Sequence, residues 1–295
     1  MSYVTLNNGA VVYALNKGDL RMSKHFKLRK DLSLTWEGKT LYRIEALKDL
    51  PRHDVKKGDI GGFVESEDNL IENAWVYDEA KVYGGAEVSG NAKVHGYAEV
   101  CDEAEVYGNA DVFEEAEVRG SVTVSGNAKV FGDARLFGNA KVFGDSEVCG
   151  RAEVSGASWI FGDAEVYEDA RIFGDAQVFG YAEVLGNAGV YGDSEVCGNA
   201  KVYGDAAVHG EAKVTGNAVI SNDKDYLVFK NFWSSGRYFT WTRSNNMWSA
   251  GCFYGTGEEL VKKAYRDSRE SGDNYKAVVD YVNNVVLKQG GEITK

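Results

Sequence analysis

The sequence predicts a mainly-β protein built around a parallel solenoid with triangular coils. A small residue recurs every six positions from Ala74 to Ala218, which gives 25 hexads without an insertion or a deletion. An aliphatic residue follows each small residue by two positions, and glycine precedes it by two positions in 20 of the 25 hexads. A fixed short period of this kind is typical of solenoid proteins, so it predicts the architecture of this part of the chain.

Each hexad is expected to form one short strand and one bend. The unit at residues 126–131 has the sequence GNAKVF. Alternate residues of a strand point to the same side, so Ala128 and Val130 should face the core while Lys129 and Phe131 face outward. The glycine and asparagine that precede them tolerate the positive φ of a sharp bend. Three hexads with three bends close one coil, and the hexads then make about eight coils in a rod roughly 40 Å long.

Five hexads lack the corner glycine and carry an acidic residue there. We expect the bend to use another conformation at these positions, which are Glu72, Asp78, Asp102, Glu114 and Glu168. The next corner position is often asparagine or aspartate. A row of asparagines along the rod predicts a ladder of side-chain hydrogen bonds.

The pattern aliphatic-x-x-x-small-x over residues 72–221 resembles the hexapeptide repeat of left-handed parallel β-helices. That is the fold of the UDP-N-acetylglucosamine acyltransferase-like superfamily, and the resemblance implies a left-handed coil. A right-handed β-solenoid, as in bactofilin filaments, is the alternative. The strings LYRI at 41–44 and GGFVE at 61–65 are similar to the leader of uncharacterised bacterial and prophage hexapeptide-repeat proteins.

The chain is expected to have three parts. Residues 1–68 lack the period and predict a β-rich N-terminal cap, with strands at 11–13 and 40–44. A cap is needed because an open end coil exposes apolar residues and unpaired strand edges. Residues 69–221 form the hexapeptide-repeat β-helix, and residues 222–295 form a small C-terminal α+β module.

In the C-terminal module, strands are expected at 226–229, 237–241 and 247–249, and helices at 257–265 and 275–287, with Thr256 as an N-cap. The stretch WSAGCFYG at 248–255 resembles a Gly-Cys-Phe-x-Gly stretch in C-terminal modules of phage and clostridial proteins. We interpret it as a structural turn with a buried Cys252. The module is expected to determine specificity or to mediate oligomerisation, and its candidate contact residues are Arg237, Trp241, Trp248, Cys252 and Phe253.

The net charge of −12 is concentrated in the repeat region. Residues 69–221 contain 26 acidic and 10 basic side chains, so this region should repel nucleic acid and anionic membranes. No apolar run is long enough to span a membrane, and the N-terminus lacks a signal-peptide pattern. We therefore expect a cytoplasmic protein, in the host cytoplasm if it is encoded by a phage.

Cysteine and histidine positions argue against a metal, cofactor or catalytic site. Cys101, Cys149 and Cys197 follow one another at intervals of eight hexads, which is not a whole number of coils, so they should lie on three different faces. The resemblance to acyltransferases implies a trimer with a histidine base between subunits. Here His95 and His209 fall on two faces more than six coils apart, and no loop interrupts the hexads. The closely spaced histidines of γ-class carbonic anhydrases are absent.

The stacking of successive coils predicts rows of outward aromatic side chains on each face of the rod. The rows are Phe143, Phe161 and Phe179 on one face, Phe113, Phe131, Tyr167 and Tyr203 on the second, and Phe137, Phe173 and Tyr191 on the third. Stacked rings stabilise neighbouring strands, which explains them structurally. Exposed rows of this size are also unusual for a soluble monomer, so they predict association with a protein partner or a homo-oligomer such as a trimer.

The function predicted from the sequence is therefore a non-enzymatic binding or assembly scaffold of phage or prophage type, which would inhibit or sequester a host factor. An acyltransferase or acetyltransferase is one alternative. An acidic mimic of DNA is the other, since 40 Å of duplex carries about 24 phosphates and the rod carries a net charge of −16.

Overall fold

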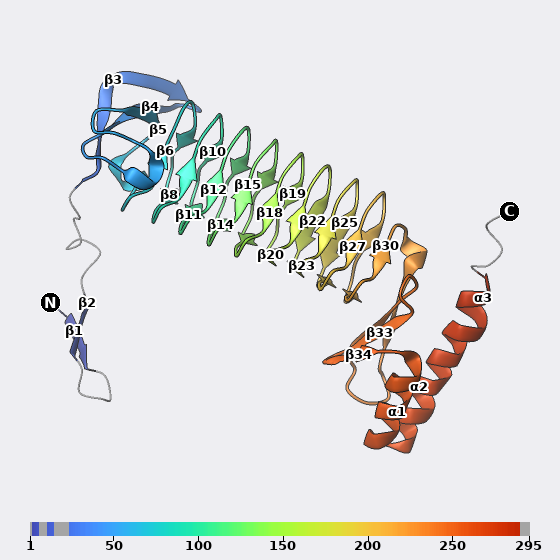
Figure 1. Ribbon diagram of the computed structural model, residues 1–295. Helices are drawn as coiled ribbons and strands as arrows, with labels where there is room; N and C mark the ends of the chain where they lie inside the picture. The colour runs from blue at the N-terminus through green and yellow to red at the C-terminus, as the bar shows by residue number, and fades with distance from the viewer. Residues whose placement is uncertain (1, 6–10, 15–23, 290–295) are drawn as a thin grey trace.

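The computed structural model describes residues 2–5, 11–14 and 24–289 and shows a straight rod with a small module at its C-terminal end (Figure 1). The predicted fold class is confirmed, because the rod is a parallel β-solenoid of about nine coils. Within the described residues, β1 (Ser2–Thr5) and β2 (Val11–Ala14) form a separate antiparallel pair.

Three parallel sheets form the three sides of the rod. The eight-stranded sheet contains β8 (Glu87–Val88), β11 (Glu105–Val106), β14 (Thr123–Val124), β17 (Lys141–Val142), β20 (Trp159–Gly162), β23 (Gln177–Gly180), β26 (Glu195–Val196) and β29 (Lys213–Val214). The nine-stranded sheet contains β6 (Trp75–Val76), β9 (Lys93–Val94), β12 (Asp111–Val112), β15 (Lys129–Val130), β18 (Glu147–Val148), β21 (Glu165–Val166), β24 (Glu183–Val184), β27 (Lys201–Val202) and β30 (Val219–Ile220).

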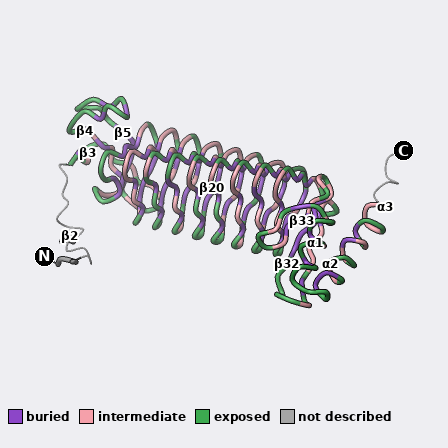
Figure 2. The backbone as a smooth tube through the Cα atoms, turned by 60° about the horizontal axis from the view of Figure 1, so that its bottom comes forward, coloured by how far each residue is buried: buried purple, intermediate pink, exposed green. Residues whose placement is uncertain are grey.

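The eleven-stranded sheet begins with three strands in antiparallel pairing and continues in parallel from the third strand. It contains β3 (Phe26–Trp36), β4 (Lys39–Ala46), β5 (Ile60–Val64), β7 (Lys81–Val82), β10 (Glu99–Val100), β13 (Glu117–Val118), β16 (Arg135–Leu136), β19 (Glu153–Val154), β22 (Arg171–Gly174), β25 (Gly189–Gly192) and β28 (Ala207–Val208). The inward residues of all three sheets are buried, while the corners are largely exposed (Figure 2).

The stacking of coils begins before the first alanine of the repeat. Val64 in β5 pairs with Val82, and Leu70 bridges to Val88, so each of these two residues stands one full coil before its partner. This additional coil accounts for about nine coils where the hexads alone predict eight.

The five acidic corner residues adopt the same left-handed backbone conformation as the glycines, so the expectation of another conformation there is wrong. Their φ angles run from 50° to 61°. At four of them the carboxylate accepts a hydrogen bond from the backbone N–H of the corner glycine in the next coil. These pairs are Asp78 with Gly96, Asp102 with Gly120, Glu114 with Gly132 and Glu168 with Gly186. The hydrogen bond offsets the strain that a non-glycine residue has at positive φ.

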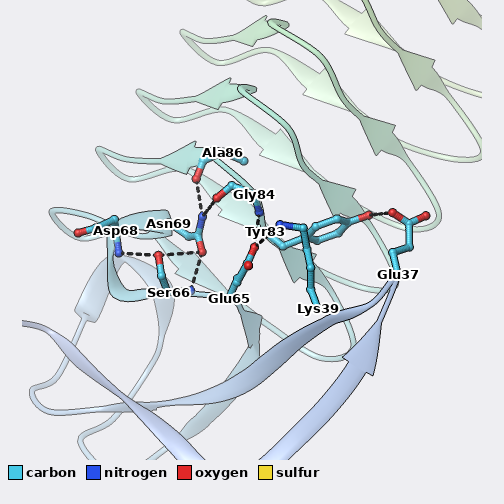
Figure 3. Close-up of polar contacts among 9 residues, drawn as sticks. All are labelled: Glu37, Lys39, Glu65, Ser66, Asp68, Asn69, Tyr83, Gly84 and Ala86. Carbon is cyan, nitrogen blue, oxygen red and sulfur yellow. Dashed lines mark hydrogen bonds and ion pairs between the residues drawn. The ribbon is translucent and has the colours of Figure 1, made fainter.

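Polar side chains of the N-terminal cap donate hydrogen bonds to carbonyl groups of the first coils. Ser66 begins the 3₁₀ turn η2 (Glu67–Asn69), and the buried Asn69 amide donates to the carbonyls of Gly84 and Ala86 at 3.1 and 2.8 Å (Figure 3). The His25 ring donates from Nε2 to the carbonyl of Ala74 at 2.9 Å. These side chains therefore supply donors to carbonyl groups at the N-terminal end of the rod, in addition to the backbone N–H groups.

The C-terminal end of the rod receives mainly acceptors. The hydroxyl oxygen of Thr240 accepts from the backbone N–H of Lys213 at 2.8 Å, and that of Ser244 accepts from Val219 at 2.7 Å. Tyr226 closes the apolar core at this end, and its hydroxyl donates to the carbonyl of Ala207 at 3.0 Å.

Apolar residues of the cap close the other end of the core and cover part of the eleven-stranded sheet. Phe26, Leu50 and Val55 belong to the same buried cluster as the valines of the rod, while Leu34 and Trp36 pack against a second cluster that includes Tyr83. The 3₁₀ turn η1 (Pro51–His53) places the buried His53 beside the Tyr77 hydroxyl at 3.1 Å.

The C-terminal module combines a four-stranded antiparallel sheet with helices. Its elements are the 3₁₀ turn η3 (Asp223–Asp225), β31 (Tyr226–Lys230), β32 (Tyr238–Thr242), β33 (Met247–Ala250), β34 (Phe253–Gly255), α1 (Gly257–Asp267), α2 (Arg269–Tyr281), a π-helical turn (Val282–Val286) and α3 (Leu287–Gln289). Thr256 is the predicted N-cap of α1 and forms a capping box with Glu259. The second helix begins at Arg269 and not near residue 275, because Ser268 caps it by accepting from the backbone N–H of Ser271.

We predict that corner glycines differ in their tolerance of a side chain. Gly156 and Gly210 both have a positive φ, which costs alanine about 1–2 kcal/mol. A Cβ on Gly156 would lie 2.6 Å from the carbonyl oxygen of Gly174, whereas a Cβ on Gly210 meets nothing within 4 Å. Gly156→Ala should therefore lower the free energy of unfolding more than Gly210→Ala in urea denaturation followed by circular dichroism. Equal losses would show that coil contact adds nothing.

We also predict that the N-terminal cap loses stability in weak acid. Burial lowers the pKa of both His25 and His53 below the usual value of 6.5, so the folded state favours the neutral rings. As the pH falls below 6.5 the unfolded chain binds more protons, and the free energy of unfolding decreases by at most about 1.4 kcal/mol per pH unit for each histidine. Urea denaturation between pH 7.5 and pH 5.5 measures this slope. The variant H25Q/H53Q should flatten it, and an unchanged slope would contradict the assignment.

Candidate interaction surface

Each hexad presents two outward side chains on its strand, one before and one after the buried aliphatic residue. On the nine-stranded and eleven-stranded sheets these positions form ion pairs between coils. The pairs include Lys129 with Glu147, Lys201 with Glu183, Lys81 with Glu99 and Arg171 with Glu153, at 2.6–3.7 Å. Charged side chains therefore cover much of two sides of the rod.

The middle of the eight-stranded sheet differs from this pattern. Across β14, β17, β20 and β23 the outward residues include four aromatic rings, one cation and no acid, and we call this set the aromatic face. Its members are Thr123, Ser125, Lys141, Phe143, Trp159, Phe161, Gln177 and Phe179. Among the ion pairs of the described residues, the one between outward residues of this sheet is Lys213 with Glu195, beyond the aromatic face.

The three phenylalanines of the aromatic face form one continuous stack. Phe143 and Phe161 lie 5.0 Å apart between ring centroids, and Phe161 and Phe179 lie 4.7 Å apart, with nearly parallel planes. These separations match the rise of one coil, so the strand spacing itself brings the rings into contact. The side chains are half-buried, which leaves part of each ring open to a partner.

Trp159 completes the aromatic face. The predicted aromatic rows contain only residues that follow the buried aliphatic position, so they do not include Trp159. It stands before Ile160, where most hexads carry a charged residue, and this departure is the signal in the sequence. Its side chain is 39% exposed and meets Phe143 edge-on at 6.2 Å. The Lys141 ammonium lies 5.0 Å from the centre of the indole ring.

The other aromatic residues predicted as contacts lie on the two remaining sides of the rod. Phe113 stacks on Phe131 at 4.7 Å, and Phe173 stacks on Tyr191 at the same distance. The remaining three residues, Phe137, Tyr167 and Tyr203, have a non-aromatic residue on either side in their rows. The structure thus does not bring the ten predicted rod residues together on one surface.

The candidate residues of the C-terminal module have different surroundings. Trp241 and Trp248 lie in the core of the module, which gives both rings a structural role. Arg237 is exposed in the loop before β32, and Phe253 is half-buried at the start of β34. Cys252 is exposed in the turn between β33 and β34, so the interpretation of this thiol as buried is wrong.

Both histidines of the rod contact other side chains. His95 Nε2 lies 3.0 Å from the Asp111 carboxylate, and its ring stacks on Phe113 at 4.8 Å. The sequence did not indicate Asp111 as the partner of His95, because Asp111 lies two positions short of one full coil after His95. His209 stacks on Tyr191 at 5.6 Å on another side of the rod.

The cysteine thiols of the rod are poorly suited to nucleophilic chemistry, and two hollows on the described surface are shallow. Burial raises the pKa of Cys101 and Cys197, and it raises that of Cys149 to about 11, so these thiols are weak nucleophiles. No group of histidine, cysteine and acidic side chains within the described residues is arranged to hold a metal ion. Two shallow hollows lie at the corner between the nine-stranded and eleven-stranded sheets, with charged linings that include Arg151 and Asp169.

Comparison with protein-family models finds no match to this chain, and comparison with curated proteins finds none either. Over the described part of the chain, no helix has both the length and the apolar character needed to cross a membrane.

We predict different effects of two truncations in the aromatic face. Phe161→Ala removes the central ring of the stack, and each aromatic pair contributes about 0.5–1.5 kcal/mol beyond the area it buries. The free energy of unfolding should therefore fall by about 1–3 kcal/mol for the two pairs that are lost. Trp159→Ala removes a more exposed ring outside the stack and should cost less. Urea denaturation of both variants checks this order, and a larger loss for Trp159→Ala would contradict it.

Proposed function

We propose that this protein is a non-enzymatic protein-binding scaffold and that the aromatic face is its contact surface. The observation that carries the proposal is the composition of this face. Its eight outward residues include four aromatic rings and no acid, in a region with 26 acidic side chains. Depletion of charge and enrichment of aromatic residues are typical of the centres of protein interfaces. Tryptophan is also the residue type most often found as an energetic hot spot, which favours Trp159 as the anchor.

The rigidity of the rod supports the same function. Backbone hydrogen bonds fix the strands of the aromatic face, and the stack of rings restricts the side chains of Phe143, Phe161 and Phe179. A surface that is ordered before binding loses little conformational entropy when a partner docks. The solenoid therefore suits a scaffold that holds an interface in one shape.

The resemblance of the leader to prophage proteins supports a phage-type role within this proposal. The partner would then be a host protein in the cytoplasm, which the scaffold inhibits or sequesters.

Capture from a host lysate tests the contact surface. The tagged full-length chain should retain a partner that is lost with Trp159→Ser. Phe137→Ser is the matched control, because Phe137 is 40% exposed, is outside any aromatic stack and lies on the eleven-stranded sheet. A protein retained by the wild type and the control but not by Trp159→Ser supports the proposal. Equal capture by all three overturns the assignment of the aromatic face.

The pairing of His95 with Asp111 favours acyl transfer as a second candidate function. A carboxylate that orients a histidine is part of many general bases. Release of free coenzyme A from acetyl-CoA in the presence of amino sugars would measure this activity. It should disappear with His95→Gln and persist with His209→Gln, and the absence of release by the wild type would exclude acyl transfer under these conditions.

A further inference from the structure

Four acidic corner residues lie along the edges of the aromatic face and just beyond its C-terminal end. Asp145 and Asp163 lie at the corner towards the nine-stranded sheet. Asp175 lies at the corner towards the eleven-stranded sheet, beside β23, and Asp193 lies one coil further along that corner, beside β26. All four side chains are exposed. None of them takes part in an ion pair within the described residues, although Asp145 accepts a hydrogen bond from the Asn127 amide at 2.8 Å. We call these four residues the acidic rim.

A stable interface on the aromatic face must extend beyond its eight outward residues. The face contributes eight outward residues, whereas a specific interface uses about 20–30 residues on each side. Its four strands also cover only roughly 19 Å along the rod. A partner that buries enough surface therefore reaches beyond the face, and where it crosses the corners it meets these carboxylates.

From the acidic rim and the acid-free centre, we propose that the partner is a basic protein surface in which lysine or arginine residues surround an apolar centre. This inference rests on the proposed function and specifies the partner of the same face. The apolar centre of the partner would contact Trp159 and the phenylalanine stack, while its cations would meet the acidic rim. Complementary charge at a rim increases the rate of association and excludes wrong partners.

Charge argues against a second copy of this chain as the occupant. A copy docked through the same face would bring the same four carboxylates to the edges of the interface, and the whole chain has a net charge of −12. Like charges that face each other across an interface are unfavourable. Lys141 is the one cation in the aromatic face, and it already lies over the Trp159 ring.

The geometry of the rings also argues against a carbohydrate that stacks on an aromatic platform. Such a platform needs open ring faces, but the rings of Phe143, Phe161 and Phe179 are stacked on one another. The ammonium of Lys141 lies against the ring of Trp159. Nucleic acid and anionic lipid are excluded as occupants by the sign of the rim charge.

Binding of a synthetic amphipathic peptide tests the chemistry of the partner. The probe is a fluorescein-labelled helical peptide of leucine and lysine, and the comparison peptide has glutamate in place of lysine. Fluorescence anisotropy with the full-length chain should show binding of the lysine peptide alone. Trp159→Ser should weaken it by about tenfold or more, as expected for loss of an interface anchor.

Two variants with the same change in net charge separate specific from general attraction. D145N/D163N/D175N/D193N neutralises the acidic rim and should weaken binding by a similar factor, with a smaller dependence on salt. E115Q/D133N/E165Q/D205N neutralises four exposed acids on other parts of the rod, and its affinity should stay within about threefold of the wild type. Equal losses for both variants would overturn the inference, because the peptide would then respond to total charge.

Sedimentation, peptide binding and lysate capture together distinguish a failure of the basic partner from a failure of the contact surface. A dimer in sedimentation equilibrium that Trp159→Ser dissociates would overturn the basic partner and leave the aromatic face as a contact surface. No effect of Trp159→Ser on either the peptide or the lysate capture would overturn both proposals. Loss of lysate capture without any binding of the lysine peptide would overturn only the basic partner.

Discussion

The hydrogen-bond register between successive coils is the constraint on which this structure depends. Along most of the rod, the N–H of an outward residue donates to a carbonyl in the next coil at a constant offset along the chain, so every coil must have the same length. One inserted residue would shift the buried alanine and valine positions to the surface. The same register brings corner backbones so close together that glycine dominates there, and it sets the spacing at which aromatic rings stack. Local features of the rod are therefore consequences of one repeat length.

The sequence predicted the solenoid because the period is long and uninterrupted, and the strands of the C-terminal module followed from alternation. Corner acids at positive φ could not be predicted from propensity, since it is the carboxylate contact with the next coil that offsets the strain. The start of α2 was not predicted, because the sequence alone does not show that Ser268 caps this helix. The turn at Cys252 was predicted, but its thiol was expected to be buried and is exposed. The left-handed coil, which rests on the family resemblance, stays a prediction.

The surface of the rod is less determined by the fold than its interior. Any outward residue that tolerates a strand is compatible with the register, so lysine, glutamate, threonine and tryptophan all occur before the aliphatic position. An acid-free stretch on one side is therefore not required for folding. For this reason the aromatic face is more informative about function than the far more regular core.

The two ends of the rod are capped by different sets of hydrogen bonds. Asn69 and His25 supply donors to the first coils, whereas Thr240 and Ser244 supply acceptors to the last coil. The solenoid is consequently polar along its axis, with distinguishable N-terminal and C-terminal ends, and its two caps cannot exchange places. Between them, one whole coil could be duplicated without altering either terminus. Length is then an independently variable property of this architecture, and the distance between the two capping domains can change in steps of one strand spacing.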